Sequence, residues 1–96
     1  MSSYSVTRSA RRDVDGIWDY VARDSAAQAD RLIDWLTTKF EKLGDSPYLG
    51  GRWRPRRPLR AFSAKNFTIF YVPAPGGVEI RRVFRAGLDL DALDFD

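Results

Sequence analysis

Arginine is the residue type in this chain whose spacing is best suited to chemistry, because arginines crowd one short segment. The segment LGGRWRPRRPLRAF, residues 49–62, contains Arg52, Arg54, Arg56, Arg57 and Arg60. A guanidinium binds carboxylate and phosphate oxygens through two parallel hydrogen bonds, yet it keeps its proton because its pKa exceeds about 12. The segment is therefore suited to holding an anionic partner and poorly suited to proton transfer.

A tryptophan, Trp53, lies among these arginines. A tryptophan in this setting can stack on a base, fill a pocket of a partner, or pack under its own neighbours. Pro55 and Pro58 remove backbone donors, so the segment cannot form a regular inner strand. We expect a surface loop in which Trp53 is either an anchor for a partner or part of the core.

The chain contains no cysteine and no histidine. Disulfide and thiolate chemistry are therefore excluded, and the commonest ligand of zinc and the usual proton shuttle are both missing. We predict that the protein uses no metal and no cofactor.

Charge is distributed unevenly along the chain. Residues 1–51 are close to neutral, whereas residues 52–85 carry eight arginines and one lysine against a single acid, Glu79. Residues 86–96 carry four aspartates and no base. This pattern predicts an anionic partner for the basic part and an internal contact for the acidic tail. The alternative is a solvated surface that keeps the protein soluble.

Length and composition indicate one folded domain spanning residues 1–96. The chain is 44% hydrophobic, which is enough for a single core. No apolar run approaches the roughly 18 residues of a membrane span, and the N-terminal residues lack the hydrophobic stretch of a signal peptide. We expect a cytoplasmic protein without a membrane contact.

The sequence pattern of the N-terminal half predicts one strand followed by two helices. Alternation predicts a strand over Tyr4–Ser9, with Ser9 capping a helix that begins at Ala10. Apolar residues then recur at helical spacing, at Val14, Ile17, Trp18 and Val21. Ser25 and Gln28 form a capping box for a second helix, which we expect Gly44 to end. The short link between the helices predicts an antiparallel pair.

The C-terminal half shows the period of two that is typical of strands. We predict strands over residues 59–63, 67–72 and 78–84, joined by short turns, with a bulge at Arg81 and Arg82. The helix pair must cover one face of this three-stranded antiparallel meander, which gives a two-layer α+β fold. The expected core includes Trp18, Phe40, Phe62, Phe67 and Ile69, whereas Trp35 lies beside the apolar stripe.

The order and spacing of these elements resemble the RelE/ParE toxin superfamily, and the ParE branch in particular. The matching motif residues are Ala10, Asp13, Val14, Ile17, Trp18, Tyr20, Phe40, Leu43, Pro47, Gly50 or Gly51, Leu59, Arg60, Phe67, Ile69, Tyr71, Val78, Ile80, Arg82, Val83, Phe84 and Asp89. The chain departs from the family pattern after the last strand, where Arg85 stands in place of a histidine and Leu88 in place of a basic residue.

The resemblance implies the toxin of a type II toxin–antitoxin pair, with roles in plasmid or chromosome maintenance and stress response. RelE-like members cleave mRNA on the ribosome, whereas ParE-like members poison DNA gyrase. Both are silenced by an antitoxin whose C-terminal segment wraps around the toxin. The implied partners are thus a small acidic, ParD-like antitoxin and DNA gyrase, with direct contact to nucleic acid secondary.

RNA cleavage would need a base, an acid and cations around the phosphate. Between residues 49 and 88, the plausible proton carriers are Lys65 in a turn, Tyr71 in the apolar pattern of a strand, and Glu79. The arginines can therefore hold phosphate, but few groups can break it. We expect a non-catalytic gyrase poison with no catalytic residue; the alternatives are a ribosome-dependent endoribonuclease and a toxin-like relic that only binds antitoxin.

The arginines and tryptophans are the candidate contact residues. The candidates for target binding are Arg52, Trp53, Arg54, Arg56, Arg57, Arg60, Arg82 and Arg85. The candidates for antitoxin binding are Trp18, Trp35, Trp53 and Arg60. We expect Arg60 and Arg82 to face the same side of the sheet. The alternative is that these arginines pair with Glu79, Asp89 or Asp91.

Overall fold

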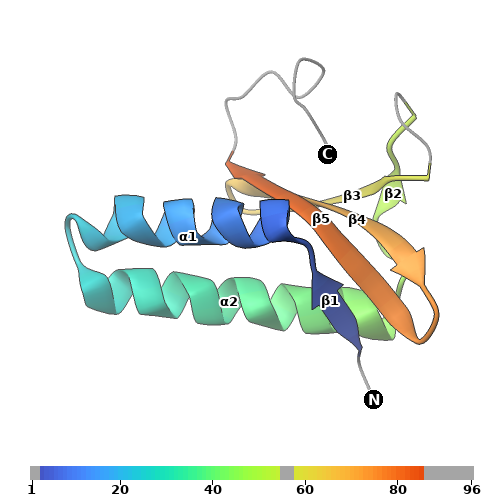
Figure 1. Ribbon diagram of the computed structural model, residues 1–96, viewed down its shortest axis with the longest axis horizontal. Helices are drawn as coiled ribbons and strands as arrows, with labels where there is room; N and C mark the ends of the chain where they lie inside the picture. Colours follow the sequence, from blue (N-terminus) through green and yellow to red (C-terminus); the bar gives the residue numbers. More distant parts are fainter. Residues whose placement is uncertain (1–2, 55–57, 86–96) are drawn as a thin grey trace.

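The computed structural model describes residues 3–54 and 58–85, which form two helices and a five-stranded sheet. The elements are β1 (Tyr4–Val6), α1 (Arg8–Ala22), α2 (Ala26–Asp45), β2 (Gly51–Arg52), β3 (Arg60–Ala64), β4 (Phe67–Ala74) and β5 (Gly77–Arg85). The helices lie side by side in antiparallel directions against the sheet (Figure 1). The predicted two-layer α+β fold is confirmed.

The sheet has the strand order β1-β5-β4-β3-β2. Strands β3, β4 and β5 form the predicted antiparallel meander, and β1 pairs with β5 in parallel after the helix pair has crossed over. Strand β2 was not predicted, because two residues are too few to show alternation. It pairs with β3 through Gly51 opposite Ala61 and Arg52 opposite Arg60.

The helix ends differ in part from the prediction. Thr7, and not Ser9, caps α1: its hydroxyl accepts from the Ala10 amide at 3.1 Å and donates to the Arg81 carbonyl at 3.0 Å. The predicted Ser25 cap of α2 is confirmed, since its hydroxyl accepts from the Gln28 amide. Gly44 does not end α2, which continues to Asp45.

Gly44 has a packing role instead. A Cβ built on this residue would lie 2.6 Å from the Ser3 carbonyl oxygen. Glycine is therefore required because the N-terminal chain passes closely over the last turn of α2.

The main core lies between the helices and one face of the sheet. Its buried members are Ala10, Leu36, Phe40, Leu43, Phe67, Ile69, Tyr71, Val78, Ile80 and Val83. Phe40, Phe67 and Ile69 are buried as predicted, and Phe62 is partly buried against them. The prediction for Trp18 is wrong: its ring is only half-buried, and the indole N–H donates to Asp30 on α2 at 2.8 Å.

A second apolar cluster forms on the opposite face of the sheet. It contains Leu59, Phe70, Val72 and Phe84, with Trp53 and Ala61 packed against it. Strand alternation explains the division, because Ile69 and Tyr71 point toward the helices while Phe70 and Val72 point away. The predicted bulge is confirmed, since Tyr71 pairs with Ile80 but Phe70 pairs with Arg82. The extra residue lets both Ile80 and Val83 reach the main core.

Candidate functional site

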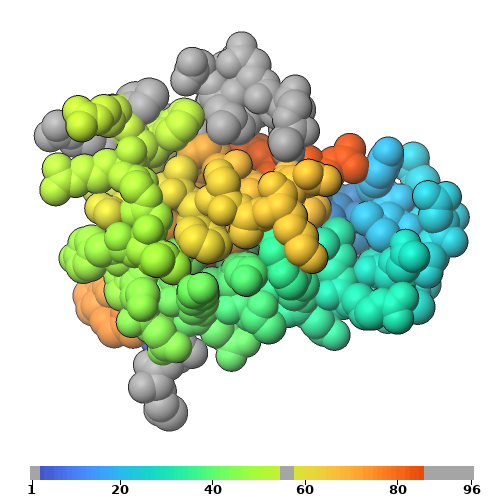
Figure 2. All heavy atoms as spheres, turned by 180° about the vertical axis from the view of Figure 1, so that it is seen from behind, coloured from blue at the N-terminus to red at the C-terminus, as the bar shows by residue number. Residues whose placement is uncertain are grey.

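The candidate site begins where the chain leaves α2 and turns into β2. The Leu49 amide donates to the Ser46 carbonyl, and the Gly50 amide donates to the buried hydroxyl oxygen of Tyr71 at 2.9 Å. A Cβ on Gly50 would lie 2.6 Å from the Ala61 carbonyl oxygen, so only glycine allows this approach. These contacts fix the segment 46–52 beside β3, which Figure 2 shows from behind in yellow-green and yellow.

Arg60 on β3 braces this segment. Its Nε donates to the Gly50 carbonyl at 2.8 Å and its Nη2 donates to the Tyr48 carbonyl at 3.2 Å. The guanidinium also lies over the Tyr48 ring, 5.1 Å from the ring centroid. Arg60 is therefore an internal clamp as well as a member of the site.

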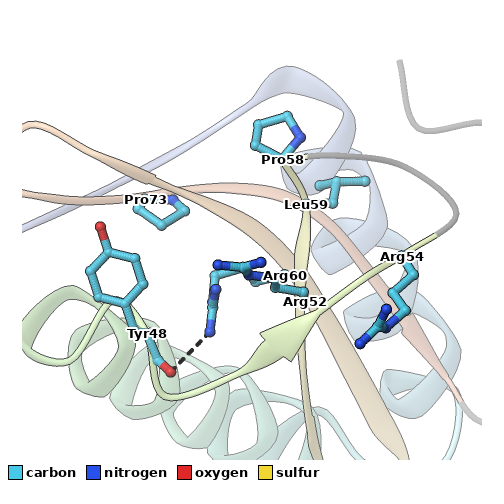
Figure 3. A pocket seen from close by; sticks show the side chains of 7 residues that line it. All are labelled: Tyr48, Arg52, Arg54, Pro58, Leu59, Arg60 and Pro73. Atoms are coloured by element: carbon cyan, nitrogen blue, oxygen red, sulfur yellow. Dashed lines mark hydrogen bonds between the residues drawn. The ribbon is translucent and has the colours of Figure 1, made fainter.

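A pocket of about 390 Å³ opens beside Arg60. Its lining residues are Tyr48, Arg52, Arg54, Pro58, Leu59, Arg60 and Pro73 (Figure 3). We call this the arginine pocket. The tyrosine ring, the two prolines and the leucine make its walls apolar, while three guanidinium groups supply positive charge.

Arg52 and Arg54 are the arginines of this pocket that are available to a partner. Both residues are exposed, and neither guanidinium makes a hydrogen bond or ion pair to another residue within 3–54 and 58–85. Arg52 pairs with Arg60 across the strands, so these two side chains lie on the same side of the sheet. Arg54 follows the end of β2 and also lines the pocket. The sequence analysis named all three as candidates for target binding, and the structure brings them to one pocket.

Trp53 points away from the arginine pocket. Its ring packs edge-on against Phe70, with centroids 5.1 Å apart and an interplanar angle of 76°, and Phe70 in turn packs against Phe84. The Trp53 amide donates to the Leu59 carbonyl at 2.8 Å. The structure therefore places Trp53 in the second apolar cluster of its own fold.

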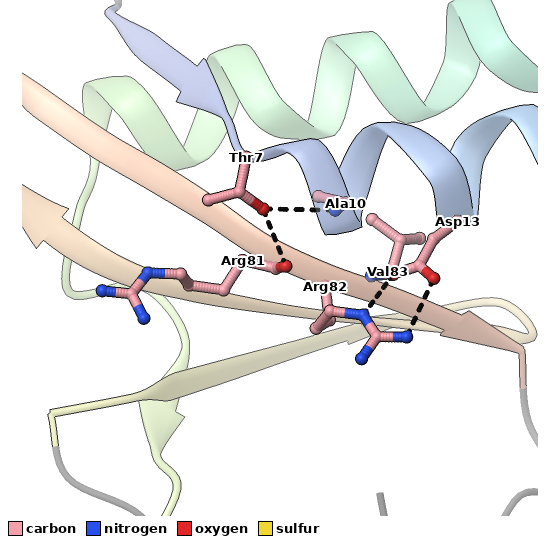
Figure 4. A network of polar contacts seen from close by, with 6 residues as sticks. All are labelled: Thr7, Ala10, Asp13, Arg81, Arg82 and Val83. Atoms are coloured by element: carbon pink, nitrogen blue, oxygen red, sulfur yellow. Dashed lines mark hydrogen bonds and ion pairs between the residues drawn. The ribbon is translucent and has the colours of Figure 1, made fainter. Parts of the chain in front are cut away.

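Arg82 and Arg85 do not join the arginine pocket. Arg82 forms a bidentate ion pair with Asp13 of α1 (Figure 4). Its guanidinium also lies over the Phe84 ring. Arg85 is exposed and lies over the ring of Tyr20, 4.2 Å from its centroid.

The expectation that Arg60 and Arg82 face the same side of the sheet is wrong. Arg60 pairs with Tyr71, whereas Arg82 pairs with Phe70, the next residue of β4. Consecutive residues of a strand point to opposite faces, so the two arginines do too. The alternative pairing of Arg82 with Glu79 is also not found, because Glu79 pairs with Arg81.

The remaining candidates lie elsewhere. Trp18 bonds to Asp30, as described above. Trp35 packs against Phe67, and the ammonium groups of Lys39 and Lys65 lie over its ring, 5.3 Å and 4.7 Å from the ring centroid. Arg56, Arg57, Asp89 and Asp91 fall outside the described residues.

The three proton carriers named in the sequence analysis are already engaged. The hydroxyl oxygen of Tyr71, a fully buried residue, accepts the Gly50 amide; Glu79 pairs with Arg81; and Lys65 lies over Trp35. Within 3–54 and 58–85, no group of three or more potential metal ligands gathers. Over the same residues, neither helix combines the length and apolar character that a membrane span needs.

Sequence reasoning missed the apolar half of the arginine pocket. Tyr48 and Pro73 are 25 positions apart, and strand pairing brings them together. One signal was present, since an aromatic residue in the turn sequence SPYLGG has few core neighbours to pack on. Tyr48 is indeed 72% exposed.

Comparisons with known proteins matched a family and a fold. A family model described as "ParE toxin of type II toxin-antitoxin system, parDE" matches residues 4–89. A solved chain described as "Chromosomal ParDE TA system from P. aeruginosa" is similar with a TM-score of 0.74 and 22% sequence identity. The match covers 90% of this chain and 97% of that chain, and at this identity it shows a shared fold. No curated protein matches the sequence.

Proposed function

Because this chain belongs to the family of ParE toxins of type II toxin–antitoxin systems, we propose that it poisons DNA gyrase without catalysis and that a small acidic, ParD-like antitoxin neutralises it. The observation that carries the proposal is the make-up of the arginine pocket. Three guanidinium groups gather on apolar walls, and none of the seven lining residues is a carboxylate, lysine or histidine. The one side-chain hydroxyl of the lining belongs to Tyr48, whose ring lies against the Arg60 guanidinium.

The chemistry of RNA cleavage argues for this reading. Guanidinium groups stabilise a phosphorane but do not exchange protons near neutral pH. A general base would have to lie within hydrogen-bond reach of the 2′-hydroxyl. Tyr71 is buried beneath the segment 46–52, and Lys65 and Glu79 are engaged by Trp35 and Arg81. The pocket is thus equipped to bind an anionic surface.

The proposed toxin acts in the cytoplasm as one domain spanning residues 1–96. Its partners are the antitoxin and gyrase, and any contact with nucleic acid is secondary. Of the candidate residues, Arg52, Arg54 and Arg85 are the exposed arginines of the described chain, so they are the first to test for contact with the target.

Induction in bacterial cells, with and without the product of the adjacent open reading frame, which we expect to be a small acidic protein, tests the proposal. We expect induction alone to cause filamentation and a DNA-damage response, and the purified protein to inhibit supercoiling by purified gyrase. Co-expression of the acidic protein should restore growth. Translation arrest with position-specific mRNA cuts would instead identify an endoribonuclease, and growth without any defect would identify a non-toxic relic.

A further inference from the structure

The arginine pocket combines two recognition elements that are separated in most surface sites. We propose that it receives an acidic segment of the antitoxin, with one large apolar side chain seated between Tyr48, Leu59 and Pro73. Carboxylates beside that side chain would bind Arg52 and Arg54. This inference rests on the proposed function, because it names the partner segment that the toxin would recognise there.

The size of the pocket suits a side chain. Its volume of about 390 Å³ falls within the range of roughly 300–1,000 Å³ that is typical of ligand pockets. The walls are formed by a tyrosine ring, two proline rings and a leucine, which offer apolar contact but few hydrogen-bonding groups. An aliphatic or aromatic anchor therefore gains more from entry than a polar group does.

The charges at the rim set the sign of the partner. Arg52 and Arg54 are exposed, and within the described residues they form no ion pair. A carboxylate next to the anchor could form a bidentate, charge-assisted pair with either guanidinium. Charge complementarity of this kind also accelerates association and selects against basic partners.

The pocket is held open before a partner arrives. Arg60 ties its own strand to the carbonyls of Gly50 and Tyr48, and the Gly50 amide is tied to Tyr71. Pro58 and Pro73 further restrict the backbone of two walls. A preformed site reduces the entropy that is lost on binding.

The lining favours a peptide over nucleic acid. Single-stranded nucleic acid usually needs exposed aromatic faces for its bases. Tyr48 is the one aromatic residue of the pocket, and Arg60 already covers one face of its ring. The lining also has no asparagine, glutamine, serine or threonine to read the edge of a base.

The test compares two double variants with the same change in net charge. Arg52→Gln/Arg54→Gln alters the rim, whereas Arg12→Gln/Arg31→Gln alters exposed positions on α1 and α2. The probe is the product of the adjacent open reading frame, which we expect to be a small acidic protein, titrated calorimetrically at about 0.05 M and 0.5 M salt. We expect the rim variant to lose at least tenfold in affinity at low salt and less at high salt, because screening weakens the lost attraction. The control should stay within twofold of the unaltered toxin.

A third variant, Tyr48→Ala, tests the apolar half of the pocket. Its loss of affinity should be similar at both salt concentrations, since the lost contact is apolar. Thermal melts of every variant check folding, and we expect each variant to remain folded because the altered side chains are exposed.

Several outcomes would overturn the inference while leaving the proposed function intact. One is that the rim variant binds the acidic protein with the same affinity as the unaltered toxin. Another is an equal loss in the rim variant and the control, which would mean a general charge effect. A third is weakened binding of a 20-base-pair DNA with unchanged antitoxin affinity.

A further outcome concerns the acidic tail of the toxin itself as the occupant of the arginine pocket. In that case the rim variant would keep its antitoxin affinity, yet it would be destabilised as much as a variant with Asp89, Asp91, Asp94 and Asp96 changed to asparagine. That result would also overturn the inference. Failure of the unaltered toxin to bind the acidic protein at all would instead contradict the proposed function.

Discussion

Asp13 of α1 and Arg82 of β5 are joined by two hydrogen bonds, although 69 positions separate them in the chain. Arg82 Nε donates to Oδ2 at 2.8 Å and Nη2 donates to Oδ1 at 3.0 Å. The Val83 amide also donates to Oδ2, at 2.9 Å. Strand β1 pairs only with residues 78–80 of β5, so the carboxylate satisfies an edge amide that β1 does not reach. The pair thereby fastens α1 to the open part of the sheet edge (Figure 4).

Asp13→Asn should lower the free energy of unfolding by about 2–3 kcal/mol, because it removes the negative charge that faces the mostly buried guanidinium of Arg82. Only 14% of the Asp13 side chain and 20% of the Arg82 side chain are exposed. The measurement is urea denaturation followed by circular dichroism. Asp15→Asn, at an exposed position of the same helix, is the control and should change the value by less than about 0.5 kcal/mol. Equal effects of the two substitutions would contradict the assigned role of Asp13.

Glycine-to-alanine substitutions should have opposite effects at Gly77 and Gly16. A Cβ at Gly77 would lie closer to the Ser3 carbonyl oxygen than two non-bonded atoms can approach, so the N-terminal chain would have to move. Gly77→Ala should cost about 1–3 kcal/mol of stability. Gly16→Ala should add about 0.5–1 kcal/mol, since Gly16 lies inside α1 with open space around it. Thermal melts of the two variants check both signs, and a stabilised Gly77→Ala would rule out the close packing of Ser3.

Trp53→Ala should destabilise the fold by about 1–3 kcal/mol, because the ring packs against Phe70 in the second apolar cluster. The control is Leu49→Ala, which removes a side chain that is 45% exposed, four positions earlier in the sequence. This substitution should lower the free energy of unfolding by less than about 0.5 kcal/mol. Denaturant titration of both variants gives the comparison. If the Trp53→Ala protein were as stable as the parent, Trp53 would not contribute to the core, and the alternative role of an anchor for a partner would apply.

Arg60→Lys should loosen the segment 46–52, because an ammonium group cannot reproduce the two bonds to the carbonyls of Gly50 and Tyr48. We expect a stability loss of about 1 kcal/mol and faster hydrogen exchange at the amides of Leu49 and Gly50. The matched control is Arg54→Lys, since Arg54 is exposed and has no bond within the described residues. Unchanged exchange in the Arg60 variant would mean that the brace is not needed.

The proposed mode of action predicts that the proton carriers are dispensable for toxicity. Lys65→Asn and Glu79→Gln should each keep growth inhibition within about twofold of the parent, because neither side chain lines the arginine pocket. Asparagine is the replacement at Lys65 because the residue has a φ of 53°, which asparagine tolerates. A reconstituted translation reaction should show uncut mRNA with the parent and with both variants. Position-specific cuts that disappear in either variant would establish catalysis.

The elements of the fold could be predicted from sequence because their signals are local. Helical spacing identified α1 and α2, and alternation identified β3, β4 and β5. The bulge at Arg81 was visible as a break in that alternation. Predictions of exact helix ends failed where a distant residue decides them. Thr7 caps α1 while it also bonds to Arg81, and Gly44 is needed for the approach of Ser3.

The sequence by itself also determined which chemistry is available, because residue types set it: many guanidinium groups, no histidine and no thiol. Only the tertiary structure decided which arginines act together. Strand register places Arg52 beside Arg60, sends Arg82 to the opposite face, and brings Tyr48 and Pro73 to one pocket. A shift of one residue in pairing reverses the face of every side chain in a strand, and pairing depends on contacts between residues far apart in the chain. For that physical reason, composition and periodicity predicted a basic binding surface, whereas the pocket itself depends on the folded sheet.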